Sequence, residues 1–251
     1  MDSAKPALVL LHGLTASGRA WQGVVPRLSG DYRVYAPTAP GHRGGPAIRR
    51  PATAWDVVDW TEQYLDGEKL DRPCIAGHSM GGFLAIELAR RGRAASVCAF
   101  APGGFWGDQR EKTMARVGRG QGAARALRPV IPLMLRSPAA RRLWFRDGAC
   151  HGDRISATRG VEIFDDFLGC TVAKEIFSTD DQQVAPLDPL PCPITVVWSE
   201  RDRINTLDTC DPVARQMLPH ANFEVLPDVG HDPMMDDPEL VARTILRVAQ
   251  T

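Results

Sequence analysis

Short apolar runs alternate with amphipathic stretches over the first hundred residues of the chain. The continuous apolar run 7–13 predicts a strand that is buried on both faces of a sheet, and further strands are predicted over residues 32–37, 73–77 and 96–103. The stretches between them place apolar residues three or four positions apart, which predicts helices over 18–30, 53–68 and 81–92. Strands that alternate with helices in this way predict an α/β fold with a doubly wound, mostly parallel sheet.

The last quarter of the chain repeats this alternation, whereas the long segment before it does not. Strands are predicted over 193–200 and 222–228, and helices over 211–218 and 237–250. Between these two parts no strong strand pattern occurs, and helical patterns cover 109–118, 122–137, 138–148, 157–169 and 171–177. We therefore expect a core formed by residues 1–105 and 190–251, with residues 106–189 inserted between two of its strands as a helical cap.

The composition is that of an ordinary globular protein and excludes several classes of partner. The 251 residues are 44% hydrophobic, and 30 basic residues balance 30 acidic ones. This balance gives no drive toward nucleic acid or an anionic membrane. No run approaches the roughly 18 apolar residues of a membrane span, and the apolar run near the N-terminus is too short for a signal peptide. We expect a cytoplasmic protein; its oligomeric state stays open.

The six cysteines are scattered, and no two of them have C-x-x-C spacing. Zinc-ribbon and redox motifs are therefore not indicated, and plain reduced thiols are expected. No metal and no organic cofactor is implied.

Charge is distributed unevenly within the predicted cap. Ten basic residues and one acidic residue lie between Arg110 and Arg146, whereas eight acidic and three basic residues lie between His151 and Leu190. The two halves can neutralise each other in space. Alternatively, the basic half can form a rim that attracts an anionic substrate or a carrier protein.

The stretch GHSMGG places Ser79 between a predicted strand and a predicted helix. Small residues two positions to either side, Gly77 and Gly81, allow the strand and the helix to approach each other around a sharp turn. Such a turn, G-x-S-x-G, exposes the serine hydroxyl at the carboxyl edge of the sheet and at the start of a helix. The pattern predicts a nucleophilic serine.

A serine nucleophile needs a base, and the base needs a carboxylate to orient it. His231 follows the predicted strand 222–228 through a short turn and reaches the same edge as Ser79, whereas His78 belongs to the turn itself. Asp202 follows strand 193–200 and is the predicted acid, because Ser, Asp and His occur in the order typical of this architecture. Asp108 and Asp228 are the weaker alternatives for the acid.

Acyl transfer also requires N–H donors for the oxyanion that develops on the substrate. One donor is the N–H of Met80, directly after the nucleophile. The loop LLHGLTAS after the first strand can supply the second, because His12 and Gly13 turn the chain and direct the Leu14 N–H toward the site.

These motifs together resemble those of the α/β-hydrolase superfamily, in the same order and across the whole chain. The resemblance lies in LVLLHGLTASGRAW, GHSMGGFLAIELA, WSERDRI and LPDVGHDPMMDDPELVA. It implies an α/β-hydrolase fold with a helical cap that covers the active site and selects the substrate. It also implies a triad of Ser79, Asp202 and His231. Haloalkane dehalogenases and epoxide hydrolases of similar pattern use an aspartate at the position of Ser79.

The sequence therefore predicts a serine hydrolase that cleaves a small-molecule carboxylic ester or thioester, with a carrier-protein thioester as a further substrate class. A carbon–carbon bond hydrolase with the same triad is the alternative among enzymes. A ligand-binding protein on the same fold, with little turnover, is the alternative outside enzymes.

Overall fold

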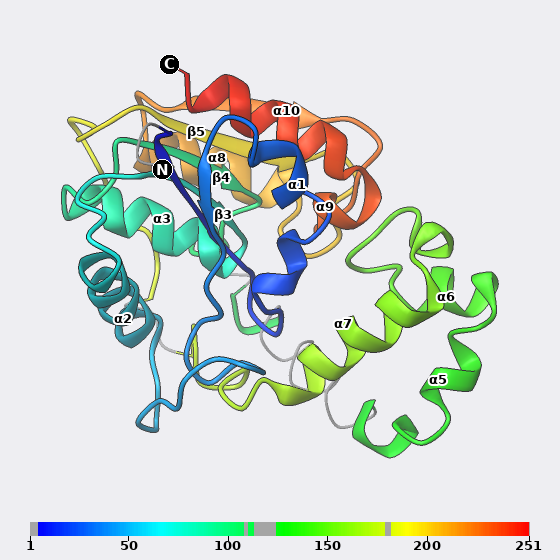
Figure 1. Cartoon of the computed structure of the whole chain (residues 1–251). Coiled ribbons are helices and arrows are strands. Elements are labelled where there is room, and N and C mark those ends of the chain that lie inside the picture. Colours follow the sequence, from blue (N-terminus) through cyan, green and yellow to red (C-terminus); the bar gives the residue numbers. More distant parts are fainter. Residues whose placement is uncertain (1–4, 108–109, 113–123, 179–181, 251) are drawn as a thin grey trace.

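Six strands form one sheet that is parallel throughout, in the order β2-β1-β3-β4-β5-β6 (Figure 1). The structure is a computed structural model that describes residues 5–107, 110–112, 124–178 and 182–250. The strands are Ala7–Leu11 (β1), Arg33–Tyr35 (β2), Cys74–His78 (β3), Ser96–Phe100 (β4), Ile194–Ser199 (β5) and Asn222–Leu226 (β6). Because all strands run the same way, the loops that follow them meet at one edge of the sheet.

The sheet has an apolar layer on each face because side chains alternate along each strand. In β1, Val9 and Leu11 belong to the apolar cluster on one face, and Leu8 and Leu10 belong to the cluster on the other. Both sets are almost fully buried. This burial on both faces explains why the strand appears in the sequence as an unbroken apolar run.

Helices cover both faces of the sheet. The cluster around Val9 includes residues of α2 (Ala54–Gly67), α3 (Met80–Arg90) and α8 (Leu207–Met217). The opposite cluster includes residues of the 3₁₀ helix η1 (Gly18–Trp21) and of α1 (Val25–Leu28) and α10 (Pro238–Val248). The predicted fold class, a doubly wound parallel α/β sheet, is confirmed.

The helices of the core differ from the prediction in three places. The predicted helix 18–30 is divided into η1 and α1, because Pro26 is tolerated only in the first turn of a new helix. Helix α8 begins at Leu207 and continues through Pro212, although the sequence predicted a start at residue 211. The short helix α9 (Pro233–Asp236) was not predicted.

The segment between β4 and β5 is helical and lies to one side of the sheet (Figure 1). It contains α5 (Ile131–Met134), α6 (Pro138–Trp144), η3 (Gly152–Arg154) and α7 (Ala157–Gly169). It has an apolar cluster of its own, which includes Ile131, Phe145 and Phe164. The predicted helical insert is thus confirmed, and its boundaries as a separate domain stay a prediction.

Within the insert, two predicted helices are corrected. The predicted helix 122–137 is interrupted by a turn at residues 128–130, where Pro129 cannot donate a backbone hydrogen bond. Residues 173–177 form turns instead of a helix, and Phe177 has a left-handed φ of 62°. Most of the predicted helix 109–118 lies outside the described residues.

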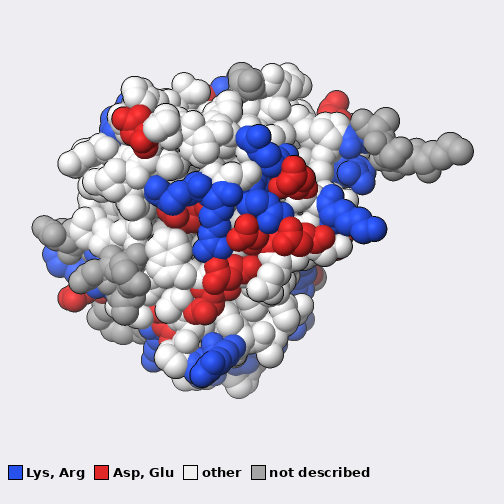
Figure 2. Space-filling view, turned by 90° about the vertical axis from the view of Figure 1, so that its left-hand side faces the viewer, with Lys and Arg blue, Asp and Glu red and all other residues white. Residues whose placement is uncertain are grey.

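Basic and acidic side chains alternate on the face of the molecule that carries α2 (Figure 2). Arg91 pairs with Asp59 at 2.7 Å and with Glu62 at 2.8 Å, and Arg93 pairs with Glu62 at 3.1 Å and with Asp66 at 2.6 Å. Exposed pairs of this kind contribute little to stability. Their main consequence is that this face presents no single sign of charge to a partner.

The described part of the chain contains no helix long and apolar enough to cross a membrane. All six cysteines lie in that part as free thiols, and four of them are buried.

Candidate active site

Ser79 occupies the turn between β3, which ends at His78, and α3, which begins at Met80. Its backbone has φ 51° and ψ −112°, which is outside the regions that L-residues prefer. A conformation of this kind costs about 1–3 kcal/mol and is maintained by the surrounding structure. The Ser79 N–H donates to the Phe100 carbonyl at 2.9 Å, and the Ser79 carbonyl accepts from Gly103 at 2.9 Å. The elbow is therefore fixed against the end of β4.

The glycines around Ser79 are required by backbone packing. A Cβ atom at position 77 would overlap the carbonyl of Gly81, and one at position 81 would overlap the carbonyl of Leu11. Neither contact can be relieved by rotating a side chain, because both involve main-chain atoms. The G-x-S-x-G spacing thus follows from how closely β3, α3 and β1 approach one another.

His231 and Asp202 are in direct contact. His231 Nδ1 donates to Asp202 Oδ2 at 2.7 Å, and both side chains are buried, at 6% and 0% exposed. His231 follows β6 and Asp202 follows β5, so the two residues meet at the carboxyl edge of the sheet. Because Nδ1 carries the hydrogen, Nε2 of His231 has a free lone pair and can accept a proton.

The loop that carries Asp202 is fixed by hydrogen bonds that the sequence analysis missed. Asp202 Oδ1 accepts from the N–H groups of Ile204 at 2.7 Å and Asn205 at 2.9 Å. The buried Asn205 side chain in turn donates to the Ala101 carbonyl at 2.9 Å and accepts from the Trp106 indole. Asn205 therefore ties the acid loop to the segment after β4. An Asp can bond the backbone N–H two residues on, which was a local signal for the turn, but nothing local indicated the long-range contacts of the Asn205 side chain.

His78 connects the elbow to the His231 loop. Its Nε2–H donates to the His231 carbonyl at 2.8 Å, and the two rings lie 4.8 Å apart, edge to face. On its other side, His78 Nδ1 lies 3.5 Å from Asp232 Oδ1. Burial lowers the pKa of His78 and raises that of Asp232 to about 6. His78 is therefore neutral at pH 7. Because His78 directly precedes Ser79, its hydrogen bond to the His231 carbonyl holds His231 close to the elbow.

The environment of His231 favours its protonated form. Burial alone would lower its pKa, but the Asp202 carboxylate, through its charge and its hydrogen bond, raises the pKa above the ordinary value. Asp232 adds a smaller effect in the same direction. An imidazolium that forms at His231 during a reaction is therefore stabilised where it forms.

We expect this shift to appear in the pH dependence of ester hydrolysis. Only the neutral form of His231 can accept a proton, so kcat/KM should fall as pH falls through the raised pKa. The acid limb should lie above the ordinary histidine value, and Asp202→Asn should move it to lower pH in any residual activity. Measuring kcat/KM from pH 5 to pH 9 tests this. An acid limb below the ordinary histidine value in the wild type would contradict it.

The loop after β1 lies against the elbow. A Cβ atom at Gly13 would be 3.3 Å from Ser79 Cβ and 2.8 Å from His78 Nδ1, so only glycine fits between the two elements. Burial lowers the pKa of His12 to about 3, and this neutral ring donates from Nδ1 to the Gly13 carbonyl at 2.8 Å. Its Nε2 accepts from the Ala39 N–H at 2.9 Å. His12 is thus a structural anchor for the start of the loop.

The two N–H groups that the sequence analysis named as oxyanion donors belong to Leu14, in the loop after β1, and to Met80, directly after Ser79, and their role stays a prediction. Met80 is the first residue of α3, where an N–H has no acceptor within its own helix. Leu14 follows Gly13 in the loop against the elbow, and among the hydrogen bonds of the described residues none is donated by its N–H.

Of the two remaining candidates for the acid, Asp228 has partners other than His231. Asp228 accepts a hydrogen bond from His151 at 3.1 Å and pairs with Arg201 at 3.1 Å, and its side chain is 57% exposed. Asp108 lies outside the described residues. Within the described ranges, no group of three or more His, Cys, Asp or Glu side chains could hold a metal ion.

Comparison with known proteins identifies the family. A family model described as Alpha/beta hydrolase family matches residues 8–244. A pimeloyl-[acyl-carrier protein] methyl ester esterase of Aromatoleum aromaticum is 27% identical over 245 residues, which cover 94% of each chain. An epoxide hydrolase of Mycobacterium tuberculosis is 28% identical over 198 residues, which cover 75% of this chain and 91% of the relative.

Among solved structures, the 2-hydroxy-6-oxo-6-phenylhexa-2,4-dienoate hydrolase of Rhodococcus sp. strain RHA1 superposes with a TM-score of 0.76. The match covers 100% of this chain and 92% of that one, at 21% sequence identity. At this level of identity the likeness establishes the shared fold.

Proposed function

The chain belongs to the alpha/beta hydrolase family, and on that premise we propose that it cleaves a carboxylic ester or thioester through an acyl-enzyme on Ser79. In this proposal His231 is the general base and Asp202 the acid that orients it. The N–H groups of Leu14 and Met80 form the oxyanion hole. Residues 106–189 act as the cap over the site.

The reaction begins when Ser79 Oγ attacks the carbonyl carbon of the substrate and its proton passes to His231 Nε2. The carbonyl oxygen becomes an oxyanion that accepts hydrogen bonds from Leu14 and Met80. The tetrahedral intermediate then collapses, and the leaving alcohol or thiol takes the proton from His231. A water molecule repeats the attack on the acyl-enzyme with His231 again as base, which releases the carboxylic acid and regenerates Ser79.

The single observation that carries this proposal is the buried pair of His231 and Asp202, anchored through His78 beside Ser79. The 2.7 Å hydrogen bond leaves His231 Nε2 as the acceptor, and the bond from His78 to the His231 carbonyl holds that residue next to the elbow. A buried carboxylate partner that raises the pKa of a histidine is typical of a general base.

The proposal extends to the acyl group that the substrate carries. The Aromatoleum aromaticum relative is named for a methyl ester on an acyl-carrier protein, which makes an acyl chain on a carrier protein a candidate substrate. The charges of the cap give this candidate limited support. Arg128 pairs with Asp165 at 2.7 Å and Arg142 with Asp153 at 3.7 Å, so the basic and acidic halves are joined at two places. The buried Arg141 donates to three backbone carbonyls.

A panel of p-nitrophenyl esters with different chain lengths tests the proposal, and it should include one neutral ester and one anionic ester of matched size. We expect turnover of at least one ester. Because Arg128 and Arg142 are paired with acidic residues of the other half of the cap, we expect the ratio of kcat/KM for the matched pair to change less than about 2-fold between low and high salt. A clear preference for the anionic ester that fades with salt would instead indicate a basic entrance.

The panel also separates the alternatives. Turnover of a vinylogous diketone, without turnover of any ester, would favour the carbon–carbon bond hydrolase. Stabilisation of the fold by a ligand, with no turnover of any compound and no labelling of Ser79 by a fluorophosphonate, would favour a binding protein.

A further inference from the structure

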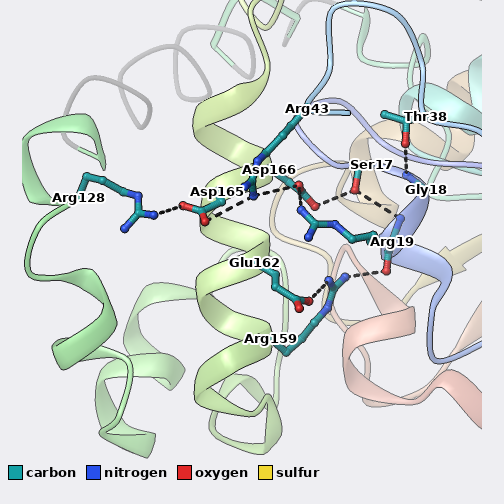
Figure 3. Close-up of polar contacts among 10 residues, drawn as sticks. All are labelled: Ser17, Gly18, Arg19, Thr38, Arg43, Arg128, Arg159, Glu162, Asp165 and Asp166. Atoms are coloured by element: carbon teal, nitrogen blue, oxygen red, sulfur yellow. Dashed lines mark hydrogen bonds and ion pairs between the residues drawn. The ribbon is translucent and has the colours of Figure 1, made fainter. Parts of the chain in front are cut away.

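The loop between β1 and η1 is held from outside the core by helix α7 of the cap (Figure 3). The Ser17 hydroxyl donates to Asp166 Oδ2 at 2.7 Å, and the Arg19 guanidinium pairs with Asp166 Oδ1. A second cap residue, Arg159, donates from Nη2 to the Arg19 carbonyl at 2.8 Å. These contacts join segments that are about 140 residues apart in the chain.

A third cap residue reaches the same loop one helical turn beyond Asp166. Burial raises the pKa of the Cys170 thiol, and nearby backbone N–H groups, that of Thr15 among them, oppose this shift. Arg159 and Asp166 are seven residues apart, so they lie on one face of α7, and Cys170 follows the end of that helix directly. That face is directed at residues 15–19, immediately after Leu14.

The two ends of the loop are fixed by different parts of the protein. The His12 ring fixes its start within the core through the Gly13 carbonyl and the Ala39 N–H. Beyond Leu14, the Ala16 N–H donates to the Gly13 carbonyl at 3.1 Å within the loop, and the core contributes the hydrogen bond from the Gly18 N–H to Thr38 Oγ1 at 3.0 Å. The cap contributes the contacts to Ser17 and Arg19.

The Asp166 carboxylate is well suited to hold this loop. Its side chain is only 4% exposed, and Arg43 Nη1 lies 3.9 Å from its Oδ1 on the side away from Ser17. A buried carboxylate with these partners has little freedom to move, because any displacement would leave its charge unpaired in a poorly solvated position.

We infer that Asp166 is a positioning residue that holds the Leu14 N–H in place for the oxyanion, so that the oxyanion hole is complete only when the cap helix α7 is seated. This inference rests on the proposed function. An oxyanion donor must lie within about 2.7–3.1 Å of the developing charge, so a small displacement of the loop weakens it strongly. Asp166 acts through Ser17 and does not touch the substrate.

The test compares Asp166→Ala with Asp165→Asn in the full-length chain. Asp165 is the adjacent residue on α7. It pairs with Arg128 and, at 3.4 Å, with Arg43, and in the described structure it makes no hydrogen bond or ion pair with residues 13–19. We expect Asp166→Ala to lower kcat for a short acetyl ester about 10- to 100-fold with KM changed less than about 3-fold. Asp165→Asn should stay within about 2-fold of the wild type.

Rates are expressed per active site titrated with a fluorophosphonate, because a merely structural role would reduce the number of active sites and leave kcat per site unchanged. The Ki of a trifluoromethyl ketone, whose adduct carries the same oxyanion, should rise in parallel with the loss of kcat. If Asp166→Ala does not fold, Ser17→Ala removes the same contact from the other side and should show the same pattern with a smaller loss.

Two outcomes overturn the inference while the proposed function stands. The first is an unchanged kcat per site in Asp166→Ala, or in Ser17→Ala if Asp166→Ala does not fold. The second is a loss of kcat in Asp165→Asn that equals the loss in Asp166→Ala. A wild type that hydrolyses no ester and takes no label at Ser79 overturns the proposed function, and the inference with it.

Discussion

Ser79→Ala is expected to lower kcat by at least about 10³-fold, because no other side chain placed at the elbow can form the acyl-enzyme. The fold should be retained. Ser79 accepts and donates its structural hydrogen bonds through the backbone, and alanine preserves those bonds and the φ of 51°. The melting temperature should therefore change little.

Hydrolysis of the best ester of the panel and labelling by a fluorophosphonate measure the effect together. The wild type should carry the label on Ser79, as located by peptide mass spectrometry, and Ser79→Ala should carry none. Ser29→Ala is a suitable control, because Ser29 is an exposed residue whose hydroxyl only caps α1 through the Val25 carbonyl. Labelling that persists in Ser79→Ala would assign the nucleophile elsewhere.

Asp202→Asn is expected to reduce kcat about 10³- to 10⁴-fold. The amide oxygen can still accept from the N–H groups of Ile204 and Asn205, so the loop should keep its shape. The amide nitrogen would then face His231 Nδ1 and favour the tautomer with hydrogen on Nε2. His231 would thus lose both its function as a base and the charge that stabilises its imidazolium.

Asp228→Asn and Asp108→Asn are the matched controls for the acid, and both should retain kcat within a few-fold. Asp228 contacts His151 and Arg201 instead of His231. The assignment would be wrong if Asp108→Asn were the inactive variant, since the acid would then come from the loop after β4. Circular dichroism and melting temperature separate this result from loss of the fold.

The central strands could be predicted from the sequence because burial on both faces favours apolar residues at most of their positions, whereas the edge strands β2 and β6 also carry exposed polar residues. In β3 and β4, for example, Ile75 and Val97 face one layer while Ala76 and Cys98 face the other. The same reasoning led to the prediction of Ser79, Asp202 and His231, because each lies in the connection after a strand and parallel strands end at one edge.

The contacts of Asp166 on α7 with Ser17 and Arg19 could not be predicted in this way. Asp166 and Ser17 are 149 residues apart, and neither residue has a local pattern that singles out the other. The charge asymmetry of the cap indicated that its halves could pair. It did not indicate that Asp166 would turn toward Arg19 of the core, because that depends on how the cap packs. The interruption of the predicted helix 122–137 was missed for a local reason, since its apolar periodicity continues through Pro129.

The packing of the elbow determines which of its positions tolerate substitution and which do not. Position 79 is half-buried and contributes its structural bonds through the main chain, so the side chain there can be exchanged while the fold persists. Positions 77 and 81 are occupied by neighbouring main chain and admit only glycine. A library that varies position 79 therefore samples new catalytic chemistry, whereas a library that varies positions 77 and 81 samples only the ability to fold.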